Sequence, residues 1–274
     1  ACNGEIYLCL SSLEHNAPWL RKIWIVVDDQ SPDLSRLSAA LRAKIHLVDH
    51  TEIFADHGAT LPTFNSLAIE TFLWNIPGLS DRFIYFNDDV FLTAPCQQAD
   101  FFTKHGPILR GAWADFSVLQ DDPVQMADPA KFNHYMQLNA AGLCGMPPER
   151  LFRAAHVAHP CSRRTMAQLH NQFNAAFRDN ARYQMRDIRQ FSPQSLHNHA
   201  CILHKTAKLH PIKDHHHIYS GQGVGAADGT IPTLLQNLRD TPDLKMLCVN
   251  DLPQLEALYP DIRSWLAQLL TGAP

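Results

Sequence analysis

Acidic and amide side chains follow three apolar runs of this 274-residue sequence, and their types and positions suit cation chemistry. Short runs rich in β-branched and aromatic residues predict buried strands. In an open α/β sheet, ligands bind beyond the carboxyl ends of the strands, so we expect the polar groups to converge on one crevice. The three groups are Asp28-Asp29 after residues 23–27, Asn87-Asp88-Asp89 after residues 83–86, and Asn250-Asp251 after residues 244–249.

Asp88 and Asp89 are the strongest candidates for metal ligands. Two adjacent carboxylates repel each other unless a cation or a hydrogen-bond donor compensates their charge. Oxygen ligands of this kind suit Mg²⁺ or Mn²⁺, with substrate phosphates completing the coordination shell. Asn250 and Asp251 are second candidates for the same ion. The competing interpretation, in which these residues cap helices or turns, stays open and is strongest for Asp28.

The sixteen histidines give weaker signals. The run 215–217 is interpreted as a solvated loop, because adjacent side chains point in different directions. His156 and His159 would share a face if their segment were helical, but Pro160 favours a turn. Spacing alone therefore gives only weak support to His159 as a general base.

Two arginines are candidates for contacts with an anion. Arg163 and its neighbour Arg164 stand at the predicted start of a helix, where the helix dipole disfavours positive charge, so a bound anion would relieve the conflict. Arg186 either binds a phosphate or forms a surface ion pair with Asp187, and the sequence leaves both interpretations open.

Strands alternate with helices, which predicts an α/β fold with crossover connections. We expect a Rossmann-like, mostly parallel sheet flanked by helices, with a helical sub-domain in the C-terminal half. The whole chain is expected to form one catalytic domain. Its parts would be an α/β core half (1–103), a loop-rich and helical insert (104–243), and a final strand and helix (244–274), with 104–150 irregular. The expected helices span 5–15, 34–43, 65–75, 163–178, a segment opened by Ser192-Pro193, and 253–270.

Composition bounds the class of protein. Hydrophobic residues make up 46% and charged residues 18%, which predicts a filled core. The net charge of −4 argues against nucleic acid as a partner. No apolar run of about 18 residues predicts a membrane-spanning helix. The seven scattered cysteines are expected to be reduced core thiols, so we predict a cytoplasmic location, with peripheral association at the inner face of the membrane left open.

The segments ATLPTFNSLAIE (59–70) and IPGLSDRFIYFNDDVFL (76–92) resemble the second motif block of the Stealth family. Residues 5–30 also fit this block. The segments 156–160, 185–187 and 193–196 resemble the third block, and 247–251 the fourth. The family's first block, a strand with a Trp-Val-Asp/Asn-Gly type sequence, has no counterpart here. We expect that it either precedes Ala1 or is lacking in this member.

The resemblance implies transfer of a sugar-1-phosphate from a nucleotide diphosphate sugar, such as UDP-GlcNAc, to a glycan hydroxyl in capsule synthesis. The donor nucleotide-sugar and the polysaccharide acceptor would be the partners, with Mg²⁺ or Mn²⁺ as cofactor; the oligomeric state is not predicted. His159 would be the general base, with Asp28 or Asp89 as rivals, and Arg186 would stabilise the phosphate. The implied substrate-binding residues are Glu5, Asn65, Glu70, Asn87 and Arg163.

Two alternatives remain open at this point. A metal-dependent glycosyltransferase would use a similar donor but release a nucleoside diphosphate. A non-catalytic module that binds glycans or nucleotide-sugars would keep the binding residues without turnover.

Overall fold

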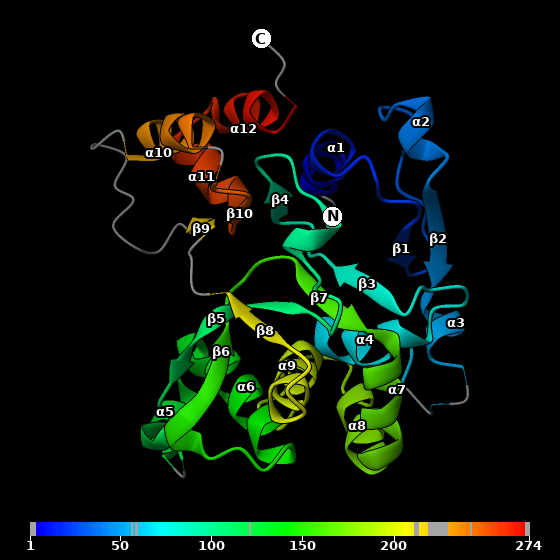
Figure 1. Ribbon diagram of the computed structural model, residues 1–274, viewed down its shortest axis with the longest axis vertical. Coiled ribbons are helices and arrows are strands. Elements are labelled where there is room, and N and C mark those ends of the chain that lie inside the picture. Colours follow the sequence, from blue (N-terminus) through cyan, green and yellow to red (C-terminus); the bar gives the residue numbers. More distant parts are fainter. Residues whose placement is uncertain are drawn as a thin grey trace.

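The computed structural model describes residues 4–55, 57, 60–120, 122–210, 214–218, 230–241 and 243–271. Helices and strands alternate along the chain, so the α/β class is confirmed. Helices α1, α10, α11 and α12 gather at one end of the molecule and α6 to α9 at the other (Figure 1). Most strands lie between them, but the strand Leu151–Ala154 runs beside α6. Residues 87–89 connect the strands Arg82–Tyr85 and Val90–Leu92.

The main core joins the beginning of the chain to its end. Helix α1 (Glu5–Asn16) packs on strand β4 (Val90–Leu92) and on helix α12 (Ile262–Thr271). Strand β10 (Met246–Val249) is fully buried and pairs antiparallel with β4 on one side. On its other side it pairs parallel with β9 (His215–Ile218). The final strand therefore lies beside the segment that follows Asn87-Asp88-Asp89.

Strand pairing is more mixed than the sequence predicts. Strands β1 (Ile23–Val27) and β2 (Ile45–Asp49) are parallel, whereas β3 (Arg82–Tyr85) and β7 (His159–Ser162) are antiparallel. Of the six described pairings three are parallel and three antiparallel, so the expectation of a mostly parallel sheet is wrong. Apolar runs report burial but not the direction of the partner strand. Strand β1 is also only half-buried along its length.

The segment 104–150 is ordered rather than irregular. Strand β5 (Ile108–Ala114) pairs with β6 (Leu151–Ala154) and β8 (Lys208–His210), and α6 (Phe132–Leu143) packs beside them. Arg110 and Gly111 interrupt the apolar pattern of β5, which concealed this strand in the sequence. The insert between residues 104 and 243 thus carries strands as well as helices.

The remaining elements follow the predicted order with shifted ends. The predicted helix at 34–43 shortens, the one at 163–178 divides at Phe173, and Ser192 caps the next helix by accepting from the Ser195 N–H as expected. These helices are α2 (Ala39–Arg42), α3 (His50–Ile53), α4 (Ser66–Phe72), α5 (Pro123–Ala127), α7 (Arg163–Gln172), α8 (Asn174–Ala181), α9 (Pro193–Leu203), α10 (Thr230–Asp240) and α11 (Leu252–Leu258). The 3-10 turns are Leu73–Asn75, Gln98–Asp100, Ser117–Leu119, Pro129–Lys131 and Pro148–Arg150.

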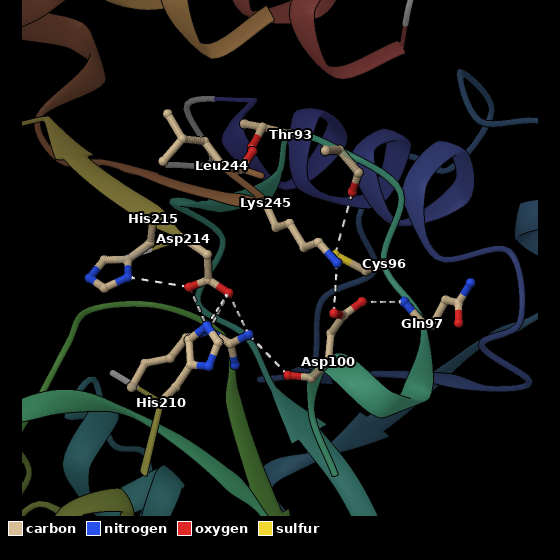
Figure 2. A network of polar contacts seen from close by, with 11 residues as sticks. Thr93, Cys96, Gln97, Asp100, His210, Asp214, His215, Leu244 and Lys245 are labelled. Carbon is tan, nitrogen blue, oxygen red and sulfur yellow. Dashed lines mark hydrogen bonds and ion pairs between the residues drawn. The ribbon is translucent and has the colours of Figure 1, made fainter. Parts of the chain in front are cut away.

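A buried ion pair inside the insert is tied to the core by further polar contacts (Figure 2). The guanidinium of Arg110 donates to both carboxylate oxygens of Asp214, at 2.7 to 3.0 Å, and also to the Asp100 carbonyl at 2.9 Å. Lys245 contacts the Asp100 carboxylate at 2.6 Å, and its backbone N–H donates to the Asp214 carbonyl at 2.8 Å. His210 lies 3.3 Å from the same Asp214 carboxylate. The network fixes the chain just before β9, and so the position of that strand.

Candidate active site

Two of the predicted polar groups meet at the ends of β3 and β10. The loop after β3 turns sharply, with the Val90 N–H donating to the Asn87 carbonyl at 3.2 Å. The Asp89 carbonyl accepts from the Val249 N–H at 2.9 Å. The side-chain amide of Asn250 donates to Asp89 Oδ2. The predicted convergence of Asn87-Asp88-Asp89 with Asn250-Asp251 is therefore present in the structure.

Four carboxylates gather at this point. Glu5 stands at the start of α1, and its pKa is raised by burial and by the charges of Asp88, Asp89 and Asp251. Burial raises the pKa of Asp88 as well, and the neighbouring Asp89 adds to the shift. Asp251 precedes α11 with a left-handed backbone, at φ 58°. Close like charges of this kind are costly, and a bound cation would relieve the repulsion.

One oxygen of Asp89 has no hydrogen bond. Its Oδ1 is buried and lacks a hydrogen-bond partner among the described residues. The imidazole of His156 lies close by, with its Nε2 atom 3.6 Å from this oxygen. A buried oxygen without a hydrogen-bond partner is unfavourable unless a ligand binds to it. Together with the carboxylates around it, this oxygen fits a hard divalent cation such as Mg²⁺ or Mn²⁺.

A chain of polar contacts leads from this cluster into the core. His156 Nε2 lies 3.0 Å from the side-chain nitrogen of Asn87, and the Asn87 oxygen accepts from the Tyr85 hydroxyl. The Tyr85 oxygen also lies 2.8 Å from Glu70, whose second oxygen accepts from Gln194 at 3.0 Å. A buried carboxyl is thus linked to the strand-end cluster through a tyrosine and an amide.

Burial and the number of acceptor oxygens around Tyr85 both favour a proton on Glu70. Burial raises its pKa, and the hydrogen bonds from Tyr85 and Gln194 only partly oppose the shift. The Tyr85 hydroxyl has one proton but faces two acceptor oxygens, on Glu70 and Asn87. A protonated Glu70 satisfies all of these contacts, because it can donate to Tyr85 while Tyr85 donates to Asn87.

The interpretation of 215–217 as a solvated loop is wrong, because these residues begin β9. His217 is directly opposite Cys248 in the parallel pair, and its Nε2 contacts the Asn250 side chain. Its ring lies 5.3 Å from that of His156. Sequence reasoning weighed His156 but did not assign it to the site, and it missed His217, because β9 has no apolar pattern and pairs with the distant β10.

His159 has a different environment from His156. It lies on β7, with its ring stacked against that of Tyr85 at a centroid distance of 6.3 Å. Burial, and then the nearby His156 and His197, lower the pKa of His159 to about 3. This imidazole is neutral at physiological pH and a weak proton acceptor. His156 lies closer to the carboxylates.

Arg186 lies near Glu70, whereas Asn65 has a structural role. The exposed Arg186 donates to the Ser66 hydroxyl at 2.9 Å and lowers the pKa of Glu70 electrostatically. Asn65 is fully buried, caps α4, and donates to the Tyr183 carbonyl at 3.0 Å and to Gln190 at 2.8 Å. These bonds occupy the Asn65 amide, so its expected role in substrate binding is not supported.

Arg163 is remote from the cluster. Because β3 and β7 are antiparallel, Arg163 follows the residue opposite Arg82, at the other end of β3 from Asn87. Its side chain donates to the Trp74 carbonyl at 3.0 Å. The acid that faces the start of α7 is Asp81, which accepts from the backbone N–H of Arg164 at 2.9 Å. The expected anion site at Arg163 is therefore wrong, since the protein supplies its own anion there.

A cleft of about 1760 Å³ opens beside the cluster. Residues of α1, β1, α4 and β3 line it, including Asn87, Asp88 and Glu70. Asp28 also lines it and is exposed, but lies after β1 rather than in the carboxylate cluster. The cleft has ample room for a nucleotide-sugar, and Asp88 is on its wall.

The sequence comparison finds a known family region that contains part of this site. Residues 2–109 match the profile of Stealth protein CR2, conserved region 2. The chain carries a Stealth conserved region 2. The resemblance seen in the sequence is confirmed, and the region contains Glu5, Glu70 and the Asn87-Asp88-Asp89 loop.

Curated relatives share this region of the Stealth chain. An exopolysaccharide phosphotransferase of Streptomyces coelicolor is 33% identical over 200 residues, which are 71% of this chain and 20% of the relative. The capsular polysaccharide phosphotransferase WcwK of Streptococcus pneumoniae is 43% identical over 103 residues, which are 38% of this chain and 30% of the relative. The chain thus spans between a fifth and a third of the length of these relatives.

One solved structure covers nearly the whole chain. The galactosyltransferase LgtC, solved with donor and acceptor sugar analogues, aligns over 99% of this chain and 94% of its own. The TM-score is 0.46 and the sequence identity 15%.

Among the described residues, no helix has the length and apolarity needed to cross a bilayer.

Proposed function

We propose that this Stealth chain transfers a sugar-1-phosphate from a nucleotide diphosphate sugar to a glycan hydroxyl. The observation that carries the proposal is the carboxylate cluster of Glu5, Asp88, Asp89 and Asp251 beside a cleft of nucleotide-sugar size. The relatives' names as capsular and exopolysaccharide phosphotransferases support the same reaction. Phosphoryl transfer of this kind depends on positioning and charge stabilisation, which such a cluster with a cation provides.

In the proposed reaction, the acceptor oxygen forms a bond to the sugar-linked phosphorus. The bond from that phosphorus to the nucleoside monophosphate breaks, and the hydroxyl proton passes to a base. Asp88, Asp89 and Asp251 would hold Mg²⁺ or Mn²⁺, which when bound supplies positive charge to the diphosphate. Asn250 would keep Asp89 oriented through its amide contact.

The base that accepts the hydroxyl proton is a separate part of the proposal. His156 is a better candidate than His159, because it contacts both Asn87 and Asp89, whereas the pKa of His159 is lowered to about 3. Asp89 remains a second candidate. The proposed role of Asp28 is reduced to lining the cleft.

Arg186 is proposed to bind the transferred phosphate. Its guanidinium is exposed and bonded to Ser66, a residue that lines the cleft. A planar guanidinium can bind two phosphate oxygens at once. Glu70 is proposed to position Tyr85 and Asn87 rather than to touch the sugar.

The released nucleotide tests this function against its nearest rival. A Stealth phosphotransferase releases a nucleoside monophosphate, whereas a glycosyltransferase with a similar donor releases a nucleoside diphosphate. The purified chain, incubated with UDP-N-acetylglucosamine, Mg²⁺ and capsular oligosaccharides, should release UMP only with acceptor present. Release of UDP would favour the glycosyltransferase, and tight donor binding without turnover would favour a binding module. A cytoplasmic location, with the polysaccharide acceptor at the membrane surface, is part of the proposal.

A further inference from the structure

A second group of metal-ligating side chains lies next to Asp89. His156, His217 and Cys248 each offer one ligand atom, and the three atoms lie within 4.8 Å of one another. They come from three separate segments: the loop before β7, strand β9 and strand β10. His217 and Cys248 are directly opposite in the parallel pair, so their side chains project from the same face of the sheet.

Asp89 completes this group as a fourth donor. Its Oδ1 lies 3.6 Å from His156 Nε2, is buried, and has no hydrogen-bond partner among the described residues. Its Oδ2 accepts from the Asn250 amide, which holds the carboxylate in this orientation. Asn250 also contacts His217, so one amide orients two of the four donors.

We propose that His156, His217, Cys248 and Asp89 bind a transition-metal ion of the zinc class. A thiolate, two imidazoles and a carboxylate are the donors that Zn²⁺ and Co²⁺ accept in tetrahedral sites, whereas Mg²⁺ prefers oxygen ligands. Metal–donor bonds of about 2.0–2.3 Å place tetrahedral donors roughly 3.5 Å apart. The donor atoms now lie within 4.8 Å of one another, and rotation of the half-buried His156 ring and the exposed His217 ring can shorten this spacing.

The burial of the donors fits such a site. Cys248 is completely buried, and the side chain of His156 is 32% exposed. The thiol therefore lies at the protected base of the site, while the imidazoles leave a path to solvent. On binding, Cys248 releases its thiol proton to solvent and coordinates as a thiolate.

The site would couple to the carboxylate cluster through Asp89. An ion of the zinc class held by Asp89 and His156 would withdraw the carboxylate from the cluster with Asp88 and the imidazole from its proposed role as base. Its binding would therefore oppose both the hard cation and the proposed reaction. The site itself is inferred from the geometry of its donors and does not depend on the proposed phosphotransferase reaction. It can therefore be tested by metal binding alone.

Cobalt absorption spectroscopy on the reduced, metal-free full chain tests this site. Co²⁺ should give a thiolate charge-transfer band in the near ultraviolet and the visible bands of a four-coordinate ion. Equimolar Zn²⁺ should abolish both, because Zn²⁺ binds such sites more tightly than Co²⁺. In Cys248→Ser the charge-transfer band should disappear, and in His156→Gln the Co²⁺ affinity should fall at least about tenfold.

Matched controls keep the result decisive. Cys144→Ser alters a half-buried thiol outside the site and should leave both bands unchanged. His156→Gln alters a partly exposed side chain, so it tests the site even if the buried Cys248→Ser variant fails to fold. The proposal is overturned if the wild-type chain gives no thiolate band, or if the band is the same in His156→Gln and in the wild type.

Discussion

The Arg110–Asp214 network and the Asp88–Asp89 cluster both contain buried or half-buried carboxylates. In the first the carboxylate is paired with a cation, whereas in the second the carboxylates lie beside one another. Both oxygens of Asp214 accept from Arg110, and although burial opposes it, the hydrogen bonds from His215 and Arg110 lower the pKa of Asp214 well below its usual range. Asp88 lies among other acids, and its pKa is raised by burial and by Asp89. The first region carries its own counter-charge, whereas the second needs one from outside.

This contrast separates structural charge from functional charge. A paired, buried carboxylate fixes the position of strands and stays ionised whatever the ligand. Carboxylates that raise one another's pKa repel each other in the folded protein. Binding of a cation relieves this repulsion and is therefore favoured. The largest effects of substitution should therefore appear as loss of stability at the first region and loss of activity at the second.

Arg110→Met should give the largest change in stability. It leaves the buried Asp214 carboxylate without its main partner, which costs about 3–5 kcal/mol of unfolding free energy. Adding Asp214→Leu should recover much of this loss, because no unpaired charge then remains. Urea unfolding followed by circular dichroism measures both. An Arg110→Met variant as stable as the wild type would show that the buried pair does not stabilise the fold.

Asp89→Asn should give the opposite pattern. Removing one carboxylate from the cluster should lower turnover at least 100-fold, about 3 kcal/mol of transition-state stabilisation, while stability stays equal or rises. Steady-state kinetics with a nucleotide-sugar donor, beside a thermal melt, separates the two effects. Asp115→Asn is the matched control, since this exposed acid only bonds Ser117 and should leave turnover unchanged. Similar losses of turnover in both variants would contradict the assignment.

Two buried histidines predict where acid first weakens the fold. The Nε2 atoms of His197 and His199 accept from the backbone N–H groups of Ser162 and Phe152, and burial lowers the pKa of each ring to about 4. Between pH 6.5 and about 4 the unfolded chain binds the extra protons, so stability falls as pH falls. Each ring contributes a slope of about 1.4 kcal/mol per pH unit below its unfolded value.

Unfolding free energies measured across this pH window test the histidine effect. The double variant His197→Gln/His199→Gln should show a flatter profile than the wild type. Acids with lowered pKa, such as Asp49 and Asp187 at about 2, lose their contribution only below the ordinary carboxyl value. An unchanged slope in the double variant would assign the acid sensitivity elsewhere.

Glu70→Gln should give the smallest change. Because burial raises the pKa of Glu70, its proton stabilises the fold at low pH, and that stabilisation is lost as pH rises through the folded pKa. Glutamine keeps the shape and cannot ionise, so stability below that pKa should change by less than about 1 kcal/mol and should not fall as pH rises through it. Glu70→Ala should cost more. A Gln variant as unstable as the Ala variant would show that Glu70 acts as a carboxylate.

The sequence predicts the site as far as local pattern reaches. Apolar runs that end in acids place Asp88, Asp89 and Asn250 at strand ends, as the sequence predicts. They meet because β4, which follows Asp89, pairs antiparallel with β10, and not through the parallel sheet that the sequence analysis expected. His217 lies beyond that reach, because β9 becomes a strand only by pairing with β10. The distance of Arg163 from the site depends on the antiparallel direction of β7, which no periodicity encodes.

The sequence also cannot tell a polar side chain that holds the fold together from one that can bind a ligand. Asn65 lies within the conserved segment, yet its amide is used entirely to cap α4 and to hold the neighbouring loop. Asp89 has the same kind of flanking sequence but retains a buried oxygen without a partner. Only the hydrogen-bond partners in the folded structure distinguish a structural amide from a carboxylate that can bind a ligand.

Thermal unfolding with increasing Mg²⁺ or Mn²⁺ tests the central claim most directly. The claim is that the carboxylates at the end of β3 await a hard cation. The ions should raise the unfolding temperature of the wild-type chain at neutral pH. The Asp88→Asn/Asp89→Asn variant should start at a higher unfolding temperature without cation and show no rise with it. An equal rise in the wild type and in the variant would contradict the account.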